Sequence, residues 1–259
     1  MSEPDQSLDL VYAAQLADRA DEIGLSYFRS ARLRVETKPD LTPVTEADRD
    51  IENALRAAVA RDRPGDGFLG EELGDDRGSS VRWIVDPIDG TRNFTRGIPV
   101  WATLIALERD DRLDLGVVSA PALGRRWWAA RGTGACANGE PIHVSGATRI
   151  EDAYFSYASP SVFEERGLGR SLDALTLSSW HAQCFSDFWQ HALVAEGRLD
   201  FALDPDAAPW DYAALQVLVE EAGGTVTDFD GSTPTGDSTI LTSNGVLHNL
   251  VLGQLSIRP

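Results

Sequence analysis

The chain has 259 residues, enough for one large domain or two small ones, and 42% of them are hydrophobic, as in ordinary globular proteins. Its 41 acidic and 23 basic side chains give a formal net charge of −18, which argues against nucleic acids and anionic membranes as partners. Its two cysteines form no Cys-x-x-Cys motif, so neither a disulfide framework nor a thiolate metal site is indicated.

No targeting or membrane-spanning pattern is visible in the sequence. The first nine residues are polar and acidic, unlike a signal peptide, and no apolar run approaches the roughly 18 residues that a transmembrane helix needs. We therefore expect a cytoplasmic protein.

Two helices are predicted in the first part of the chain. Apolar residues recur at close to helical spacing over residues 8–28, and the two prolines in residues 38–43 interrupt the pattern. Thr45 can then cap a second helix, with Asp48 three residues later. On local evidence alone, Asp48 is an acid of the first helical turn that complements the helix dipole.

A short strand over residues 68–70 is predicted next, and it ends in two acids, Glu71 and Glu72. Residues 75–80, which are rich in Asp, Gly and Ser, predict a solvated loop. The stretch from residue 83 to 94 follows, Trp-Ile-Val-Asp-Pro-Ile-Asp-Gly-Thr-Arg-Asn-Phe, and it is the most informative part of the sequence.

This central stretch predicts a strand, a break and the start of a helix. Its first three residues suit a buried strand, which breaks at the proline between two aspartates. Gly90 and Thr91 form a turn that can open a helix. Asp86 and Asp89 are therefore expected at the carboxyl end of a strand, where open α/β sheets usually place ligands.

Carboxylates in this position favour a metal site. Buried without a partner, each would cost several kcal/mol or more, whereas Mg²⁺ prefers oxygen ligands and keeps waters for a phosphate-bearing substrate. The local alternative is an acidic turn in which Asp86 or Asp89 caps the helix. Glu71 also ends a strand that could be the neighbour of the one ending at Asp86, and such convergence favours metal ions. The ions would also reverse the negative field of the protein at the site.

Strands and turns alternate in the middle of the chain. Asn138-Gly139 is a strong hairpin signal. The Gly-x-Gly-x-x-Ala pattern at residues 132–137 imitates a dinucleotide-binding motif, but it leads into this hairpin rather than into a helix, so we discard it. The strands predicted before the hairpin cover residues 101–108, 113–120 and 126–130.

An α/β alternation continues in the last part of the chain, after a predicted crossing into a second layer group around residues 149–152. We therefore divide the chain into residues 1–150 and 151–259, two α/β halves of one compact catalytic unit. The second half is expected to contain strands at residues 153–157, 199–203, 225–229 and 239–243, and helical segments at 161–174, 188–196, 210–222 and 246–255.

Five elements, taken in order, resemble the pattern of one family. They are Asp48, Glu71-Glu72, Asp-Pro-Ile-Asp-Gly-Thr at residues 86–91, Trp210-Asp211 and, after eleven residues, Gly223-Gly224. This pattern resembles the inositol monophosphatase-like superfamily of Mg²⁺-dependent, lithium-sensitive sugar phosphatases. The resemblance implies an α/β fold built as a layered αβαβα sandwich, two or three Mg²⁺ ions and a homodimer.

The resemblance also implies ligands for the ions. By motif position, a first ion would be held by Glu71, Asp86 and the carbonyl of Ile88, and a second by Asp86, Asp89 and Asp211. A third, weaker ion would rest on Glu71 and waters. Most of these ligands lie in the first half of the chain, and the last one lies in the second half.

The resemblance assigns catalytic roles as well. Thr91, paired with Asp48, would orient and help deprotonate the attacking water, with Glu71 assisting. The backbone N–H groups of Gly90 and Thr91, at the start of a helix, would bind the phosphate.

The second half of the chain is expected to select the substrate. Residues 185–189, Phe-Ser-Asp-Phe-Trp, carry an acid and aromatic rings where polyol-specific relatives are small and neutral, and Asp204 replaces a hydroxyl-binding Glu. Carboxylates beside aromatic rings suit a cationic, partly aromatic leaving group. Histidinol phosphate fits this description. Residues 100–104, 119–123, 126–131 and 187–189 also resemble the histidinol-phosphatase branch of the superfamily. The expected substrate-binding residues are Asp89, Gly90, Thr91, Asp187, Asp204 and Asp211.

The expected activity is therefore Mg²⁺-dependent hydrolysis of a phosphate monoester, with histidinol phosphate, of histidine biosynthesis, as the preferred substrate. The alternatives are an inositol-1-monophosphatase or a broad small-molecule phosphatase, because the same metal site would serve them. A non-enzymatic alternative is an interaction module that retained the fold. Beyond the small substrate, the expected partner is a second copy of the chain, with no nucleic acid and no membrane.

Overall fold

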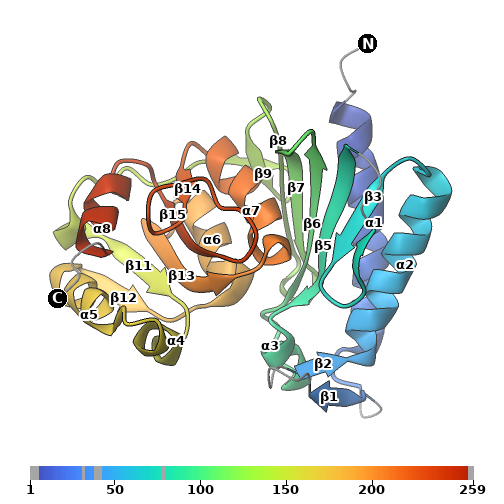
Figure 1. Ribbon diagram of the computed structural model, residues 1–259, viewed down its shortest axis with the longest axis horizontal. Helices are drawn as coiled ribbons and strands as arrows, with labels where there is room; N and C mark the ends of the chain where they lie inside the picture. Colours follow the sequence, from blue (N-terminus) through green and yellow to red (C-terminus); the bar gives the residue numbers. More distant parts are fainter. Residues whose placement is uncertain (1–5, 31–32, 38–42, 77–79, 256–259) are drawn as a thin grey trace.

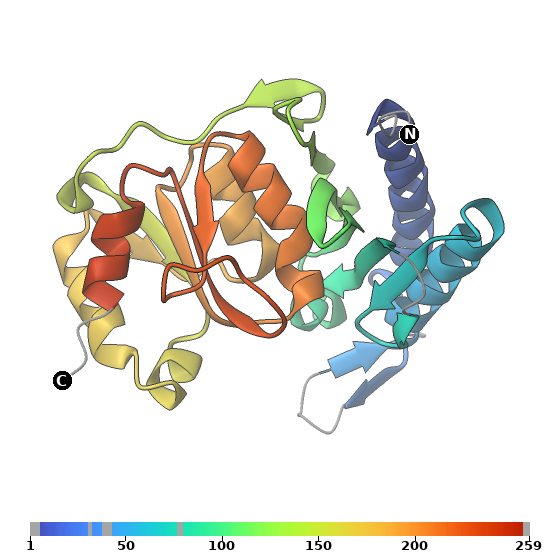
Figure 2. The same cartoon turned by 45° about the horizontal axis from the view of Figure 1, so that its top comes forward.

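Layers of helices and sheets alternate in the structure, a computed structural model that describes residues 6–30, 33–37, 43–76 and 80–255. The helices are α1 (Gln6–Tyr27), α2 (Glu46–Asp62), α3 (Thr91–Thr95), α4 (Pro160–Glu165), α5 (Gly169–Ser178), α6 (Asp187–Ala195), α7 (Pro209–Glu221) and α8 (His248–Leu255). Helices α1 and α2 cover one face of a larger sheet, and α6 and α7 lie between this sheet and a smaller one (Figures 1 and 2). Helices α4, α5 and α8 pack on the outer side of the smaller sheet. The expected αβαβα layering is confirmed.

The larger sheet has eight strands in the order β10-β9-β8-β7-β6-β5-β3-β4. Neighbouring strands in this sheet are antiparallel except for the pair β3 and β5, which run parallel. The strands are β3 (Gly67–Gly70), β4 (Gly74–Asp76), β5 (Val81–Asp89), β6 (Ala102–Arg109), β7 (Arg112–Ala120), β8 (Arg125–Ala130), β9 (Ala135–Ala137) and β10 (Glu140–Ile142).

The smaller sheet has five strands in the order β12-β11-β13-β15-β14, and a separate two-stranded hairpin precedes α2. In the smaller sheet β11 runs parallel to both β12 and β13, whereas β15 is antiparallel to β13 and β14. The hairpin strands are β1 (Val35–Thr37) and β2 (Pro43–Thr45), and those of the smaller sheet are β11 (Tyr154–Tyr157), β12 (His181–Gln183), β13 (Phe201–Ala207), β14 (Thr225–Thr227) and β15 (Ser238–Ser243).

Helix α7 is the centre of the molecule, because it has a sheet on each side. Its consecutive residues from Tyr212 to Val219 are all buried. A helix that is apolar around its whole circumference is typical of such a position. Gly116 of β7 allows the close approach of α7, since a Cβ there would lie 2.3 Å from the carbonyl oxygen of Ala214.

Several strand predictions were incomplete. Of the loop predicted at residues 75–80, residues 75 and 76 belong to the edge strand β4, because they pair with β3, and residues 77–79 lie outside the described residues. Strand β5 continues through Pro87 to Asp89, and its register against β6 shifts between Asp86 and Asp89. A bulge tolerates the missing N–H of a proline. Strand β13 likewise continues past residue 203 to Ala207 through a second register shift.

The hairpin β1–β2 and strand β12 were not predicted, because three-residue strands carry almost no periodic signal. Of the predicted proline-rich interruption at residues 38–43, residues 38–42 lie outside the described residues. None of the helices in the described ranges has the length and apolar character needed to cross a membrane.

Candidate active site

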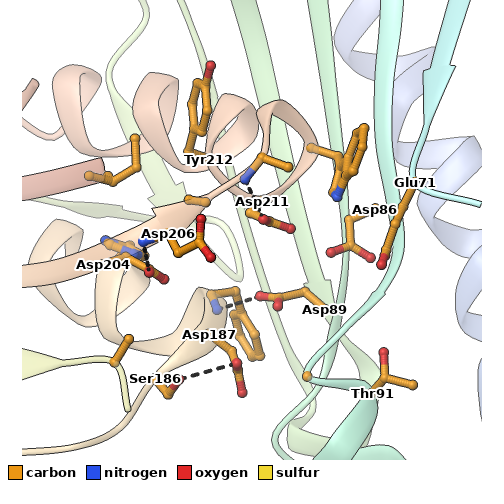
Figure 3. A pocket seen from close by; sticks show the side chains of 18 of the residues that line it. Glu71, Asp86, Asp89, Thr91, Ser186, Asp187, Asp204, Asp206, Asp211 and Tyr212 are labelled. Atoms are coloured by element: carbon orange, nitrogen blue, oxygen red, sulfur yellow. Dashed lines mark hydrogen bonds between the residues drawn. The ribbon is translucent and has the colours of Figure 1, made fainter. Parts of the chain in front are cut away.

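Two parallel strands bring the first pair of candidate residues together. Gly70, the last residue of β3, is opposite Val85 of β5. Glu71 and Asp86 come directly after these paired residues, so they lie side by side at the same edge of the sheet. Figure 3 shows their side chains pointing into one cavity. The expectation that β3 and β5 are neighbours and bring the two acids together is confirmed, but only Glu71 follows a strand end, because β5 continues past Asp86 to Asp89.

The end of β5 and the turn after it place Asp89 and Thr91. Gly90 has a φ of +83°, and a Cβ on it would lie 2.9 Å from the carbonyl oxygen of Val100. A glycine is therefore needed both for the backbone conformation and for the close packing. Helix α3 begins at Thr91 but has only five residues, so its dipole adds little to phosphate binding. Asp89 accepts a hydrogen bond from the backbone N–H of Phe188 at the start of α6.

Helix α7 supplies Asp211 from the other side of the cavity. The backbone N–H of Ala208 donates to Oδ2 of Asp211 at 2.7 Å, and Pro209 occupies the first turn of the helix, where its missing N–H is not needed. This bond fixes one oxygen of Asp211 and directs the carboxylate toward the side chains of β5 (Figure 3).

The cavity between the larger sheet and the segments α6, β13 and α7 has a volume of about 540 Å³. Its lining includes every predicted site residue except Asp48. Those residues are Glu71, Asp86, Ile88, Asp89, Gly90, Thr91, Asp187, Asp204 and Asp211.

Burial raises the pKa values of the acids at this cavity, and their charges add to the effect. Desolvation, reinforced by the charges of Glu71 and Asp89, raises the pKa of Asp86 well above its usual range. Desolvation also raises the pKa of Asp89 well above its usual range, with Asp187 as the next cause, and raises that of Asp211 to about 8. Acids held together in this way are stabilised by a cation, which lowers their pKa values again.

The carboxylates fit a hard divalent cation. Among the described residues, Oδ1 of Asp86 is buried and has no hydrogen-bond partner. Buried polar atoms are usually partnered, so this oxygen is a candidate ligand for a cation. No three Asp, Glu, His or Cys side chains in the described ranges already enclose one point as a complete metal site. A hard divalent cation takes oxygen ligands of this kind, and waters and phosphate oxygens can complete its shell.

Asp48 lies behind the cavity rather than in its lining. It is 1% exposed and forms the capping box of α2, in which its Oδ2 accepts hydrogen bonds from the backbone and hydroxyl of Thr45. Burial raises its pKa to about 7, and the charge of Glu71 adds to the effect. Its Oδ1 is buried without a partner among the described residues.

The expected pair between Thr91 and Asp48 is not formed. In the described part of the chain, no hydrogen bond joins these two side chains. Instead the hydroxyl of Thr91 donates to the carbonyl oxygen of Ile88 at 2.9 Å. The physical reason is local, because a threonine in a first helical turn reaches a backbone carbonyl three residues earlier.

The two carboxylates predicted to select the substrate line the opposite part of the cavity. Asp187 follows Ser186, and both have positive φ values, 51° and 60°, which is unfavourable for non-glycine residues. This conformation turns Asp187 into the cavity (Figure 3). Burial raises the pKa of Asp187, and burial raises that of Asp204 to about 7.

The predicted aromatic surroundings of these acids are only partly present. Phe185 and Trp189 contact each other at 5.2 Å between ring centroids, and neither belongs to the cavity lining within the described residues. The aromatic residues that do line it are Phe188, Trp210 and Tyr212. Cation–π contact from Phe185 or Trp189 is therefore not supported. Both rings are partly buried and pack against the hydrophobic core instead.

The sequence did not point to three charged residues of the lining, which are Arg92, Asp206 and Asp237. Arg92 is the residue after Thr91, and its charge lowers the pKa of Asp187. Asp206 lies two residues after Asp204 on the bulged end of β13 and forms an ion pair with Arg166. Alternation along the strand could have identified Asp206 if the strand had been predicted to continue beyond residue 203.

Known proteins resemble this chain over nearly its whole length. It matches the inositol monophosphatase family over residues 5–258. It is 49% identical to the histidinol-phosphatase of Mycobacterium tuberculosis over 96% of this chain and 98% of that protein. It is 44% identical to the histidinol-phosphatase of Streptomyces coelicolor over 98% and 99% of the two chains.

A solved structure shows the same fold. The extragenic suppressor protein suhB from Bartonella henselae superimposes with a TM-score of 0.90 at 30% identity, over 97% of this chain and 100% of that chain. The layered fold, the carboxylates at the strand ends and the match to the family model agree with one another. This chain belongs to the inositol monophosphatase family.

Proposed function

We propose that this chain is a Mg²⁺-dependent phosphate monoester hydrolase that prefers L-histidinol phosphate. The observation that carries the proposal is the division of one cavity into two acidic regions. Glu71, Asp86, Asp89 and Asp211 form a region suited to cations and a phosphate, and Asp187 and Asp204 form a second region beyond it. Relatives at 49% and 44% identity are named histidinol-phosphatases, which supports the substrate.

The first acidic region would hold the ions, with Asp86 shared between two of them and Ile88 contributing its carbonyl. When bound, Mg²⁺ neutralises phosphate charge, lowers the pKa of a water and stabilises the leaving alkoxide. The side chains and backbone of the protein then have three tasks, which are to orient the water, to bind the phosphate and to receive a proton.

Thr91 is suited to orient the attacking water. Because its hydroxyl hydrogen is donated to the carbonyl oxygen of Ile88, the lone pairs of its oxygen remain to accept a hydrogen bond from water. Glu71, on the neighbouring strand end, can receive the proton. Asp48, behind the cavity, would assist Thr91 and Glu71 through its unpartnered oxygen. The backbone N–H groups of Gly90 and Thr91 would bind the phosphate.

The second acidic region would bind the leaving group. Histidinol carries an ammonium and an imidazole, so the carboxylates of Asp187 and Asp204 can each form a charge-assisted hydrogen bond with it. A bound cation also favours the charged form of carboxylates whose pKa values are raised by burial. Polyol hydroxyls do not need two charges in this position.

An inositol-1-monophosphatase remains the second candidate, because the family name and the first acidic region fit it equally well. The intact set of site carboxylates argues against a non-catalytic interaction module. The homodimer, the lithium sensitivity and the cytoplasmic location stay predictions, as does the division of labour between residues 1–150 and 151–259.

The experiment that tests the substrate compares Asp187→Asn with the wild type on L-histidinol phosphate and inositol 1-phosphate at saturating Mg²⁺. The KM for histidinol phosphate should rise by about tenfold or more, because a charge-assisted hydrogen bond contributes roughly 1.5–3 kcal/mol. The KM for inositol 1-phosphate should change much less.

Asp173→Asn is the matched control, because Asp173 is an exposed acid on α5 and its loss changes the net charge equally. If Asp187→Asn affects both substrates equally, or if the control reproduces its effect, the cation-binding role of Asp187 is wrong.

A further inference from the structure

Glu52 is a fully buried carboxylate of α2 that has no part in the site described above. Its side chain is 0% exposed. Its Oε2 accepts a hydrogen bond from the backbone N–H of Glu72 at 2.7 Å, and its Oε1 accepts one from the backbone N–H of Leu73 at 3.0 Å. One carboxylate therefore holds two consecutive backbone amides immediately after Glu71.

Arg56, one turn further along α2, is the counter-ion of this carboxylate. Its Nη2 lies 3.1 Å from Oε1 of Glu52 and donates to the carbonyl oxygen of Gly74 at 2.8 Å. The guanidinium also lies over the ring of Phe68, 4.6 Å from the centroid, and pairs with Asp76. Glu52 and Arg56 together connect α2 to both strands and the turn of the β3–β4 hairpin.

Gly70, the residue before Glu71, has no side chain and so leaves room for the Glu52 carboxylate. A Cβ on Gly70 would lie 2.1 Å from Oε1 of Glu52, so no other residue fits while Glu52 keeps its place. The backbone of Glu71 is thus constrained on both sides. Before it, Gly70 packs against the Glu52 carboxylate, and after it, Glu72 donates to the same carboxylate.

From these contacts we propose that Glu52 is a positioning residue, which fixes the backbone at residues 70–73 so that Glu71 points into the cavity. The role rests on the function proposed above, in which Glu71 binds an ion and receives a proton. Burial of a carboxylate is unfavourable, and an apolar side chain would join a helix to a sheet at least as well. An apolar side chain cannot, however, accept hydrogen bonds from the two turn amides or hold them rigidly.

The placement on α2 agrees with this role. Asp48 and Glu52 are four residues apart and therefore lie on the same side of the helix. Asp48 is close enough to Glu71 for the charge of Glu71 to raise its pKa. Helix α2 thus carries two buried carboxylates beside the site, and Glu52 is the one that binds the backbone immediately after Glu71.

Glu52→Gln tests the role with little change of volume. One end of the Gln amide is a donor, which would face a backbone N–H instead of accepting from it. We expect faster hydrogen exchange of the amides of Glu72 and Leu73. We also expect weaker Mg²⁺ binding to the free protein by calorimetry, and a fall in kcat of about tenfold or more at saturating Mg²⁺ with little change in KM, because small displacements of a reacting group are costly.

Asp114→Asn is the matched control for the loss of a buried, arginine-paired carboxylate. Asp114 is 4% exposed on β7, pairs with Arg109 and Arg112, and is not part of the cavity lining. This variant should lose stability while keeping Mg²⁺ affinity and kcat. If Glu52→Gln loses only stability, as the control does, Glu52 has a structural role alone and the proposal is wrong.

A double-variant cycle shows whether Glu52 acts through Glu71. In a Glu71→Gln background, Glu52→Gln should cause no further loss of kcat, because the residue that it positions no longer has its charge. An equal fractional loss in both backgrounds overturns the proposal. If Glu52→Gln does not fold, Glu52→Asp replaces it in the same double-variant cycle. This variant keeps the charge, but its shorter side chain places the carboxylate oxygens farther from the amides of Glu72 and Leu73.

The wild type separates this proposal from the one on which it rests. A wild type that neither binds Mg²⁺ nor releases phosphate contradicts the proposed function and the role of Glu52 together. A wild type that does both, beside a Glu52→Gln protein with normal Mg²⁺ affinity and normal kcat, overturns the positioning role only.

Discussion

At the scale of single residues, Asp86 is placed where a carboxylate is unfavourable unless a cation is present. It is 2% exposed, and its pKa is raised first by burial and then by the charges of other acids. Oxygen Oδ1 has no hydrogen-bond partner among the residues that the structure describes. Such a group lowers the stability of the metal-free protein and is retained for its function.

Asp86→Asn should therefore separate activity from stability. Phosphate release should fall on the order of 100-fold or more, since the substitution removes a proposed metal ligand. In a chelator, the free energy of unfolding should stay the same or rise by about 1 kcal/mol, because a buried charge is removed. Denaturant unfolding with and without Mg²⁺ measures this. A variant that is less stable than the wild type in chelator, yet gains as much from Mg²⁺, contradicts the assignment.

Gly90 is a second residue of the site whose identity is fixed, in this case by the backbone conformation and the packing around it. Gly90→Ala should destabilise the protein by roughly 2 kcal/mol or more, because φ is positive and the new Cβ meets a carbonyl oxygen. Gly74→Ala is the control, since Gly74 has the same φ of +83° but no heavy atom of the described residues within 4 Å of the new Cβ. Urea unfolding should show the larger loss for Gly90→Ala. Equal losses would mean that packing at Gly90 contributes nothing.

At the scale of elements, the sequence predicts that a strand is present better than it predicts where the strand ends. The acid pair after residue 70 and the aspartates after residue 85 marked the edge of the sheet where the site lies. Strand β13 was predicted to end before Asp204, because a proline follows, yet a bulge carries it on to Ala207. Periodicity reports side chains that face a core, and it cannot report a bulge that redirects them.

Contacts between distant elements also escaped prediction. Nothing in the local sequence shows that the N–H of Phe188 meets Asp89 or that Thr91 bonds Ile88 rather than Asp48. The motif spacing predicted which residues belong to the cavity, with the exception of Asp48, because family members share the fold that assembles them. It could not predict hydrogen-bond partners, since these depend on rotamers and on segments far apart in the chain.

His191 of α6 gives a prediction on pH at this scale. It is 4% exposed, bonds Thr242 of β15 through Nδ1 at 2.9 Å, and burial lowers its pKa from 6.5 to about 3. Between these values the unfolded chain binds a proton that the folded protein does not. The contribution of neutral His191 is therefore fully present above pH 6.5 and decreases as the pH falls toward 3.

The difference in unfolding free energy between the wild type and His191→Gln isolates this effect, because Gln does not titrate. The wild type should lose stability relative to the variant by about 1.4 kcal/mol per pH unit below the unfolded pKa. A difference that stays constant from pH 7 to pH 4 would show that His191 has the same pKa in the folded and unfolded states, so that burial does not lower it.

At the scale of the whole molecule, the net charge of −18 opposes the approach of a phosphate ester. The effect should depend on the charge of the substrate. Inositol 1-phosphate is a simple anion, whereas histidinol phosphate carries compensating positive groups. Bound ions at the site and the acids at its far side would favour the second type of substrate.

Salt should therefore change the two substrates differently at saturating Mg²⁺. Between about 0.01 and 0.15 M ionic strength, the Debye length falls from about 30 to 8 Å, so long-range repulsion is screened. The KM for inositol 1-phosphate should decrease over this range, and the KM for histidinol phosphate should change less. A decrease that is larger for histidinol phosphate would show that the overall field does not act as described.

The central claim is tested most directly by kcat/KM for L-histidinol phosphate and inositol 1-phosphate, measured side by side on chelator-treated protein to which Mg²⁺ is added back. We predict no phosphate release before Mg²⁺ is restored, and afterwards a preference for histidinol phosphate of about tenfold or more, as one charge-assisted contact would give. Equal or better turnover of inositol 1-phosphate, or activity that survives removal of the metal, would contradict the account.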